Sequence, residues 1–185
     1  MKLSFMNATI SHTDTIEIKQ ATLKDLEVLA LLGRVTFRES HSKYIEDKTN
    51  LNAYLEKAFS VSTTKKELAN NNNLYFILYR NQLPVGYVKL VLNAPSEFIE
   101  NQNCCRLERI YVLDEFITHK FGLELFKKTV EKAKELQFDM MWLTVYIKNT
   151  RAINFYEKNE FKEVGSISFQ IGEQGYENPI LAKKL

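Results

Sequence analysis

The chain has 185 residues, of which 45% are hydrophobic and 26% are charged, a composition typical of soluble globular proteins and unlike disordered or collagen-like chains. This length suits one domain with one hydrophobic core. The formal net charge is only +2 and the charges are interspersed, so the sequence predicts neither a nucleic-acid partner nor a membrane partner.

The beginning of the chain differs from the rest. Residues 1–14 are polar, and we expect them to form an extension that precedes a single domain over residues 15–185. This extension lacks the apolar run of a signal peptide, and no later stretch has the roughly 20 apolar residues needed to cross a bilayer. A disulfide between the adjacent Cys104 and Cys105 is disfavoured because neighbours on a strand point to opposite faces. We therefore expect a cytoplasmic protein.

The domain is predicted to open with a strand and a helix. Residues 16–20 alternate apolar and polar side chains like a half-buried strand, and Thr22 or Asp25 can begin a helix. Residues 34–70 are mostly helical in character, without clear boundaries.

Three strands are predicted next. Residues 74–79 and 85–91 are rich in β-branched and aromatic side chains, and the segment 80–84 between them is typical of a hairpin turn. Residues 106–112 form the third strand of this group.

The second half of the chain alternates helices and strands. An amphipathic helix over 122–137 is followed by a buried strand over 141–146 and by a helix that begins at 149–156. Strands near 161–171 and 178–184 close the chain. The order predicts a mixed α/β fold with a parallel strand–helix–strand unit over 106–147. Ligands of such sheets collect beyond the carboxyl ends of the strands, which places a site just after Val112 and Tyr146.

The segment from Val112 to Gly122 leads from a strand through a short loop to a helix. Such a junction turns backbone amides and a helix N-terminus toward one point, where an anionic phosphate fits. Any ordinary loop of this kind has the same geometry, so spacing alone leaves both interpretations open.

Three segments resemble successive motifs of the GCN5-related N-acetyltransferase (GNAT) superfamily. They are residues 107–112 (LERIYV), 117–122 (ITHKFG) and 149–161 (NTRAINFYEKNEF), and the last is similar to the family pattern N-x-x-A-x-x-F-Y-x-K-x-G-F. The resemblance implies a GNAT fold with helices flanking a central, mostly antiparallel sheet that has a parallel splay between its fourth and fifth strands. Within the superfamily, residues 53–59 and 85–89 and the closing hairpin resemble bacterial spermidine/spermine acetyltransferases of the PaiA type.

This resemblance implies an enzyme. It would transfer acetyl from acetyl-CoA to a primary amine, a polyamine such as spermidine being the acceptor to which the closer likeness points, without a metal and through direct attack. Homodimers are common among the relatives.

The resemblance also assigns the acetyl-CoA site. Backbone groups at Ile110, Tyr111 and Val112 would pair with the pantetheine arm, and an amide such as that of Tyr111 would polarise the thioester carbonyl. The pyrophosphate would lie on a loop made of Ile117, Thr118, His119, Lys120, Phe121 and Gly122.

This loop departs twice from the family pattern Q/R-x-x-G-x-G/A. Ile117 replaces the polar residue and Lys120 replaces a glycine. An ammonium near phosphate is favourable, whereas a Cβ is costly where the local φ is positive. Lys120 and His119 are alternatively exposed surface residues.

Asn149 and Tyr156 lie two helical turns apart, on one side of the predicted helix. The resemblance implies that Asn149 contacts pantetheine and that the Tyr156 hydroxyl protonates the departing thiolate. The alternatives are a helix N-cap for Asn149 and core packing beside Phe155 for Tyr156.

Glu108 matches the position of a catalytic glutamate in some members of the family. Its carboxylate could relay the proton that an amine must lose before it attacks a thioester. The alternative is a glutamate in salt bridges with Arg106 or Arg109.

Other chemistries lack support in the sequence. Histidines and cysteines show no spacing typical of zinc ligands, and no nucleophile elbow, P-loop or dinucleotide motif is present. Two non-enzymatic alternatives with the same fold stay open: a module that binds CoA without turnover, and a domain that binds a partner through its sheet edge or terminal hairpin.

Overall fold

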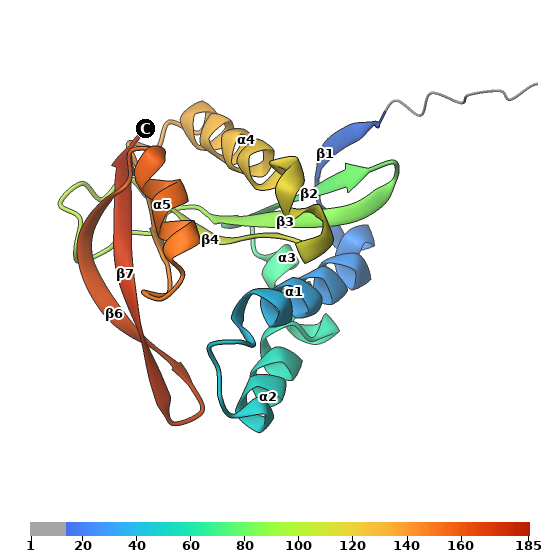
Figure 1. The fold of residues 1–185 in the computed structure, drawn as a ribbon. Helices are drawn as coiled ribbons and strands as arrows, with labels where there is room; N and C mark the ends of the chain where they lie inside the picture. The colour runs from blue at the N-terminus through green and yellow to red at the C-terminus, as the bar shows by residue number, and fades with distance from the viewer. Residues whose placement is uncertain (1–13) are drawn as a thin grey trace, which may run out of the picture.

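The structure, a computed structural model, describes residues 14–185. These residues form one seven-stranded sheet with the strand order β1-β2-β3-β4-β5-β7-β6, flanked by helices (Figure 1). Only the pairing of β4 with β5 is parallel. The predicted mixed α/β fold and its mostly antiparallel sheet are therefore confirmed. The extension expected over residues 1–14 falls almost entirely outside the described residues.

The first part of the chain forms a strand and three helices: β1 (Ile16–Gln20), α1 (Leu26–His41), α2 (Lys48–Ala58) and α3 (Val61–Ala69). Thr22 and Asp25 form a capping box around a 3-10 turn that leads into α1. Two further N-caps divide the region whose boundaries the sequence left unclear. The Asp47 side chain caps α2 and the Ser60 side chain caps α3.

A tight hairpin follows, made of β2 (Asn73–Arg80) and β3 (Leu83–Val91). Its turn contains only Asn81 and Gln82, whose φ angles are 50° and 68°. Two consecutive positive φ angles match the right-handed twist of the flanking strands. The predicted hairpin is confirmed, with a turn shorter than the expected segment 80–84.

The central unit comprises β4 (Cys104–Val112), a 3-10 turn η2 (Asp114–His119), α4 (Phe121–Glu135) and β5 (Met140–Thr144). The parallel ladder joins only Cys104–Arg106 to Met140–Trp142. Beyond Arg106 the two strands diverge, as the resemblance implied. β5 ends at Thr144, two residues earlier than predicted.

The chain closes with α5 (Thr150–Lys158) and a long hairpin of β6 (Lys162–Ile171) and β7 (Gln174–Lys184). β7 starts four residues before the expected position and pairs with both β5 and β6. At the tip of the hairpin, Gly172 has a φ of 62°, and a Cβ there would lie 2.5 Å from Asn50 of α2. The hairpin tip therefore packs against α2.

Both faces of the central strands are buried. Phe76 and Leu78 of β2 pack in the cluster that contains Leu125 of α4, whereas Tyr75 and Ile77 pack in the cluster of α1 on the opposite face. Figure 1 shows α4 on one side of strands β2–β4 and α1 on the other. Burial on both faces explains why these strands are almost continuously apolar. Within residues 14–185, no helix combines the length and apolarity required of a membrane span.

Candidate active site

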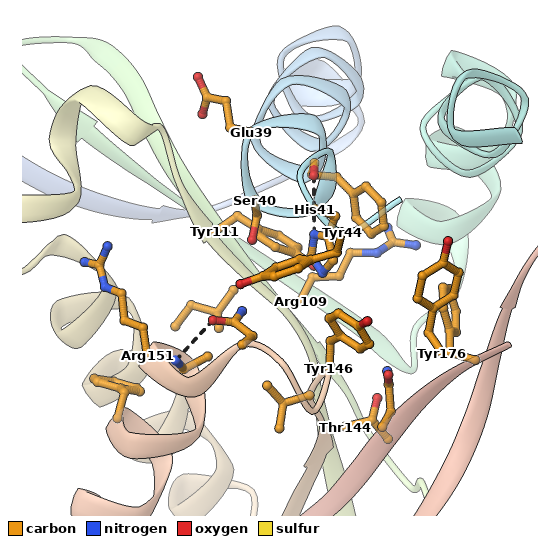
Figure 2. A pocket seen from close by; sticks show the side chains of 18 of the residues that line it. Glu39, Ser40, His41, Tyr44, Arg109, Tyr111, Thr144, Tyr146, Arg151 and Tyr176 are labelled. Carbon is orange, nitrogen blue, oxygen red and sulfur yellow. Dashed lines mark hydrogen bonds between the residues drawn. The ribbon is translucent and has the colours of Figure 1, made fainter. Parts of the chain in front are cut away.

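A cavity of about 790 Å³ lies where β4 and β5 diverge. Its walls come from the end of α1 and the loop after it, from β4, from the β5–α5 connection and from the β6–β7 hairpin (Figure 2). This is the carboxyl end of the parallel strand pair, where the sequence placed a ligand site. The cavity lining includes Glu108, Ile110, Tyr111, Val112, Ile117, Gly122, Asn149 and Tyr156, which are predicted site residues.

The backbone of β4 offers polar groups to the gap between the strands. The Leu113 N–H donates to the Val85 carbonyl of β3 across 2.9 Å, and backbone groups along a strand alternate between its two sides. The backbone of Tyr111 therefore faces β3, which agrees with the 2.8 Å that separates its carbonyl oxygen from a Cβ built on Gly86. By the same alternation, the amides of Ile110 and Val112 face the gap.

This orientation corrects one expectation. The Tyr111 amide was expected to polarise the thioester carbonyl, but it points toward β3, whereas the amides of Ile110 and Val112 face the gap. The aromatic side chain of Tyr111 still lines the cavity. The β4–β5 ladder ends at Arg106, so Ile110 and Val112 have no ladder partner in β5. An extended polar chain inserted there would meet the hydrogen-bonding groups that a strand would meet.

The expected phosphate loop lies at the start of α4. Of its six residues, Ile117 and Gly122 line the cavity, whereas Thr118, His119 and Lys120 are exposed and Phe121 is buried in the main core. These four residues can contribute to a ligand site only through backbone groups or long side chains. A Cβ built on Gly122 would meet no atom within 4 Å, so a ligand can approach the backbone closely at that point.

Lys120 occupies the glycine position of the loop pattern. Its φ is 61°, in the left-handed region, and it immediately precedes α4. The sequence analysis expected a Cβ at this position to be costly if the local φ is positive, and the φ of Lys120 is positive. A non-glycine residue in this conformation carries strain of roughly 1–2 kcal/mol.

Asn149 and Tyr156 both line the cavity. The Asn149 Oδ1 accepts a hydrogen bond of 3.3 Å from the Ala152 N–H, which confirms its N-cap interpretation. Since the cap uses only the carbonyl oxygen, the NH₂ group of the side chain can still bind a ligand.

The Tyr156 ring is 7% exposed. It packs edge to face on Phe155 and Phe161, with ring centroids 5.3 Å and 5.6 Å apart. Tyr156 therefore packs in the core, as the alternative interpretation expected, and it lines the cavity as well. Burial raises the pKa of Tyr156 above its ordinary value of 10.0, so the hydroxyl stays protonated at neutral pH and is available as a proton donor.

Glu108 lies at a β-bulge, where Lys89 pairs with Arg109 and Leu90 pairs with Leu107. The salt-bridge interpretation of Glu108 is confirmed. Its carboxylate accepts a 2.7 Å hydrogen bond from the Lys89 ammonium, and the guanidinium groups of Arg109 and Arg106 lie 3.7 Å and 3.9 Å away. The bulge sets the carboxylate at the cavity wall without removing it from this cluster of charges.

Glu67 of α3 completes the cluster, and the sequence did not identify it. It accepts hydrogen bonds from the Lys89 ammonium at 2.8 Å and from both terminal nitrogens of Arg109 at 2.8 Å and 3.1 Å. Burial alone would raise the pKa of this carboxyl, but the Arg109 charge and the bonds from Lys89, Tyr75 and Arg109 lower it below 4.5. No motif marks Glu67, because it meets β3 and β4 only through the fold.

Aromatic side chains enclose the other end of the cavity, and no motif in the sequence identified them. The Tyr44 and Tyr146 ring centroids are 5.0 Å apart, and Tyr146 and Tyr176 are 5.6 Å apart. The Tyr44 hydroxyl also donates to the Lys148 carbonyl across 3.3 Å. The loop after α1 is thereby connected to the β5–α5 loop across the cavity (Figure 2).

Metal ligands form no cluster in the described part of the chain, where no group of three His, Cys, Asp or Glu side chains converges.

Comparison with known sequences identifies relatives. The sequence model of the acetyltransferase (GNAT) family matches residues 37–161. An uncharacterized N-acetyltransferase from the pepI 3′ region of Lactobacillus delbrueckii subsp. lactis is 26% identical over 170 residues, which cover 92% of this chain and 98% of that protein.

Solved structures share the fold. The PaiA N-acetyltransferase of Thermoplasma acidophilum, determined in complex with coenzyme A, has a TM-score of 0.75 and 21% identity, covering 92% of this chain and 99% of that one. A probable acetyltransferase from Staphylococcus epidermidis has a TM-score of 0.70 and 19% identity, with coverage of 92% and 99%. Identity at this level shows a common fold.

Proposed function

The chain belongs to the acetyltransferase (GNAT) family, and from this membership we propose that it transfers acetyl from acetyl-CoA to a primary amine. The observation that carries the proposal is the gap in the parallel ladder beyond Arg106. Backbone amides facing this gap, the Tyr156 hydroxyl and the Glu108 carboxylate all border one cavity.

The residues that would hold acetyl-CoA follow the wall of the cavity. Val112 and Ile110 offer backbone amides in succession, and the start of α4 at Gly122 offers further amides to the pyrophosphate. Asn149 adds its free NH₂ group from the opposite wall. The coenzyme A bound to the Thermoplasma PaiA protein supports this choice of donor.

The donor supplies a thioester, whose carbonyl carbon the amine nitrogen attacks as the C–N bond forms and the C–S bond breaks. The Ile110 amide, the deeper of the two, hydrogen-bonds the carbonyl oxygen as negative charge develops there. Glu108 accepts the proton that the amine loses, directly or through water, and Tyr156 gives its hydroxyl proton to the leaving sulfur. The nitrogen loses a second proton as the amide forms, and this proton returns to the Tyr156 oxygen, directly or through water, while the proton taken by Glu108 passes to solvent.

The proposed acceptor is a polyamine such as spermidine. The aromatic end of the cavity supports a cationic acceptor, because the faces of Tyr44, Tyr146 and Tyr176 attract ammonium groups. The resemblance to PaiA-type spermidine/spermine acetyltransferases also supports a polyamine acceptor. Small monoamines that fit the same rings are the second group to test.

The first experiment is calorimetric titration with acetyl-CoA, followed by a thiol-release assay with spermidine and a panel of small amines. Binding together with amine-dependent thiol release supports the proposal. CoA affinity without turnover for any amine would favour the non-catalytic CoA-binding module. Absence of CoA affinity would favour the partner-binding domain.

Two expectations from the sequence stay predictions. Sedimentation of the purified chain tests the homodimer, and fractionation of the producing cells tests the cytoplasmic location.

A further inference from the structure

His41, the last residue of α1, is a cavity residue to which no role has been assigned. Its ring stacks on Phe37, with centroids 4.2 Å apart and planes 11° from parallel. It also meets Tyr111 edge to face, with centroids 5.9 Å apart. Figure 2 shows His41 beside Tyr44 and Tyr111, at the aromatic end of the cavity.

One hydrogen bond fixes the tautomer of this imidazole. The Nδ1 atom lies 3.3 Å from the Phe37 carbonyl oxygen. A carbonyl oxygen only accepts, so Nδ1 must carry the proton, and the neutral ring then has a bare lone pair on Nε2. Among residues 14–185, no hydrogen bond to Nε2 is found.

The surroundings keep this ring uncharged. Burial lowers the pKa of His41 to about 4, and the nearby Lys43 charge acts in the same direction. At neutral pH the ring is therefore a neutral acceptor. Glu108, by contrast, already has cations on three sides. Nε2 of His41 is an acceptor in the cavity lining that no described residue engages.

We propose that His41 binds the acceptor substrate, with Nε2 accepting a hydrogen bond from an N–H of the amine. This inference rests on the proposed function and extends it to the second substrate. Nδ1 already carries a proton bonded to the Phe37 carbonyl, so the free lone pair on Nε2 is the group that meets the N–H of the amine. His41 therefore orients the nitrogen, while deprotonation remains with Glu108.

Three substitutions separate the two ring nitrogens. His41→Asn keeps an amide near the position of Nδ1, where it can still bond the Phe37 carbonyl, and removes the Nε2 acceptor. His41→Gln places an amide oxygen near the position of Nε2. His41→Phe keeps the stacking on Phe37 and removes both nitrogens. Ser42→Ala, next in the chain and outside the cavity lining, serves as the control.

The expected result is a change specific to the amine. With spermidine, or with the best amine of the panel, KM should rise about tenfold in His41→Asn and His41→Phe, as for the loss of one buried hydrogen bond. His41→Gln should recover part of the loss. The acetyl-CoA Kd and the unfolding temperature should stay at wild-type values. Equal amine KM values in all variants, or a parallel loss of stability and of affinity for both substrates, would overturn the proposal.

A spectroscopic measurement tests His41 without turnover. In ¹⁵N-histidine-labelled protein, the His41 signals are assigned by their absence from His41→Asn, and Nε2 should show the shift of an unprotonated nitrogen. Adding spermidine to the CoA-bound protein should move this signal. A proton on Nε2, or an unmoved signal in the presence of an amine that the enzyme turns over, contradicts the inference. Failure of the proposed function would look different, since wild type itself would then release no thiol with any amine.

Discussion

The ammonium of Lys89 lies 2.7 Å from the carboxylate of Glu108, and it also bonds Glu67 at 2.8 Å. The Lys89 side chain is 5% exposed, so its charge depends on these two carboxylates. With Arg109 and Arg106, the cluster contains three cations and two carboxylates. Its hydrogen bond and ion pairs fix the orientation of the Glu108 carboxylate at the wall of the cavity.

Glu67→Gln should destabilise the protein by about 3 kcal/mol at pH 7, because it leaves the buried charges of Lys89 and Arg109 with Glu108 as their one carboxylate in the cluster. Urea unfolding measures the change. Glu131→Gln, which breaks an exposed pair with Lys128, is the control and should alter stability by less than about 0.5 kcal/mol.

The same variant should change the acid limb of the stability curve. The pKa of Glu67 is lowered in the folded state, so its stabilising contribution is complete above the ordinary pKa of 4.5 and is lost as pH falls through the folded value. Wild type should therefore lose more stability than Glu67→Gln on acidification below pH 4.5. Parallel curves for the two proteins would show that Glu67 does not contribute in this way.

Tyr156→Phe should lower kcat by about 10²-fold or more, the usual contribution of a general acid. The ring packing is kept, so the acetyl-CoA Kd should not change. Because burial raises the pKa of Tyr156 above 10.0, the wild-type kcat should not fall through ionisation of this hydroxyl at neutral pH. Tyr79→Phe, remote from the cavity lining, is the control. Undiminished turnover in Tyr156→Phe would remove this tyrosine from the mechanism.

Lys120→Gly should unfold at a higher temperature than Lys120→Ala, by about 1 kcal/mol in free energy, because only glycine adopts a φ of 61° without strain. Both variants lose the ammonium, so the comparison isolates the backbone. Their acetyl-CoA affinities should also lose part of the salt dependence seen in wild type. Identical unfolding of the two variants would mean that the left-handed conformation is not occupied in solution.

Gly122→Ala should weaken acetyl-CoA binding without lowering the stability of the fold. The new Cβ meets no atom within 4 Å, so stability should be unchanged or raised by about 0.5–1 kcal/mol through helix propensity, while the acetyl-CoA Kd increases if phosphate approaches this backbone. Gly86→Ala is the opposite case. Its Cβ would lie 2.8 Å from the Tyr111 carbonyl oxygen, and a loss of about 1–3 kcal/mol is expected. Unaltered binding by Gly122→Ala would place the phosphate elsewhere.

Much of the fold could be predicted because local patterns coincide with it. The strands near 74–79 and 85–91 and the α4 helix follow from periodicity, and the order of motifs indicated the splay. The region 34–70 was predicted to be mostly helical but was not divided into separate helices, because its boundaries depend on single N-caps at Asp47 and Ser60. These caps have little effect on hydrophobic periodicity.

The site was predictable where a motif runs continuously along the chain, as it does from Asn149 to Tyr156. Glu67 and His41 were missed because each lies on an α-helix outside the motifs and makes its contacts with residues distant in sequence. Glu67 bonds Lys89, and His41 packs on Tyr111 in the cavity lining. The Tyr111 amide was assigned incorrectly because sequence does not reveal which side of a strand each amide faces. That choice depends on the register with β3, which the hydrogen bond from Leu113 to Val85 fixes.

The short β4–β5 ladder also has a mechanical consequence. Only three residue pairs join β4 to β5, so this junction, the seam between the two halves of the sheet, has the fewest interstrand pairs. The amide hydrogens of Ile110 and Val112, which face the gap beyond it, should therefore exchange readily with solvent. A bound acetyl-CoA would close this seam and slow their exchange, and it would raise the unfolding temperature as its concentration rises. The metabolic supply of the acetyl donor would then determine how long each copy of the protein resists unfolding and proteolysis, as well as how fast it works.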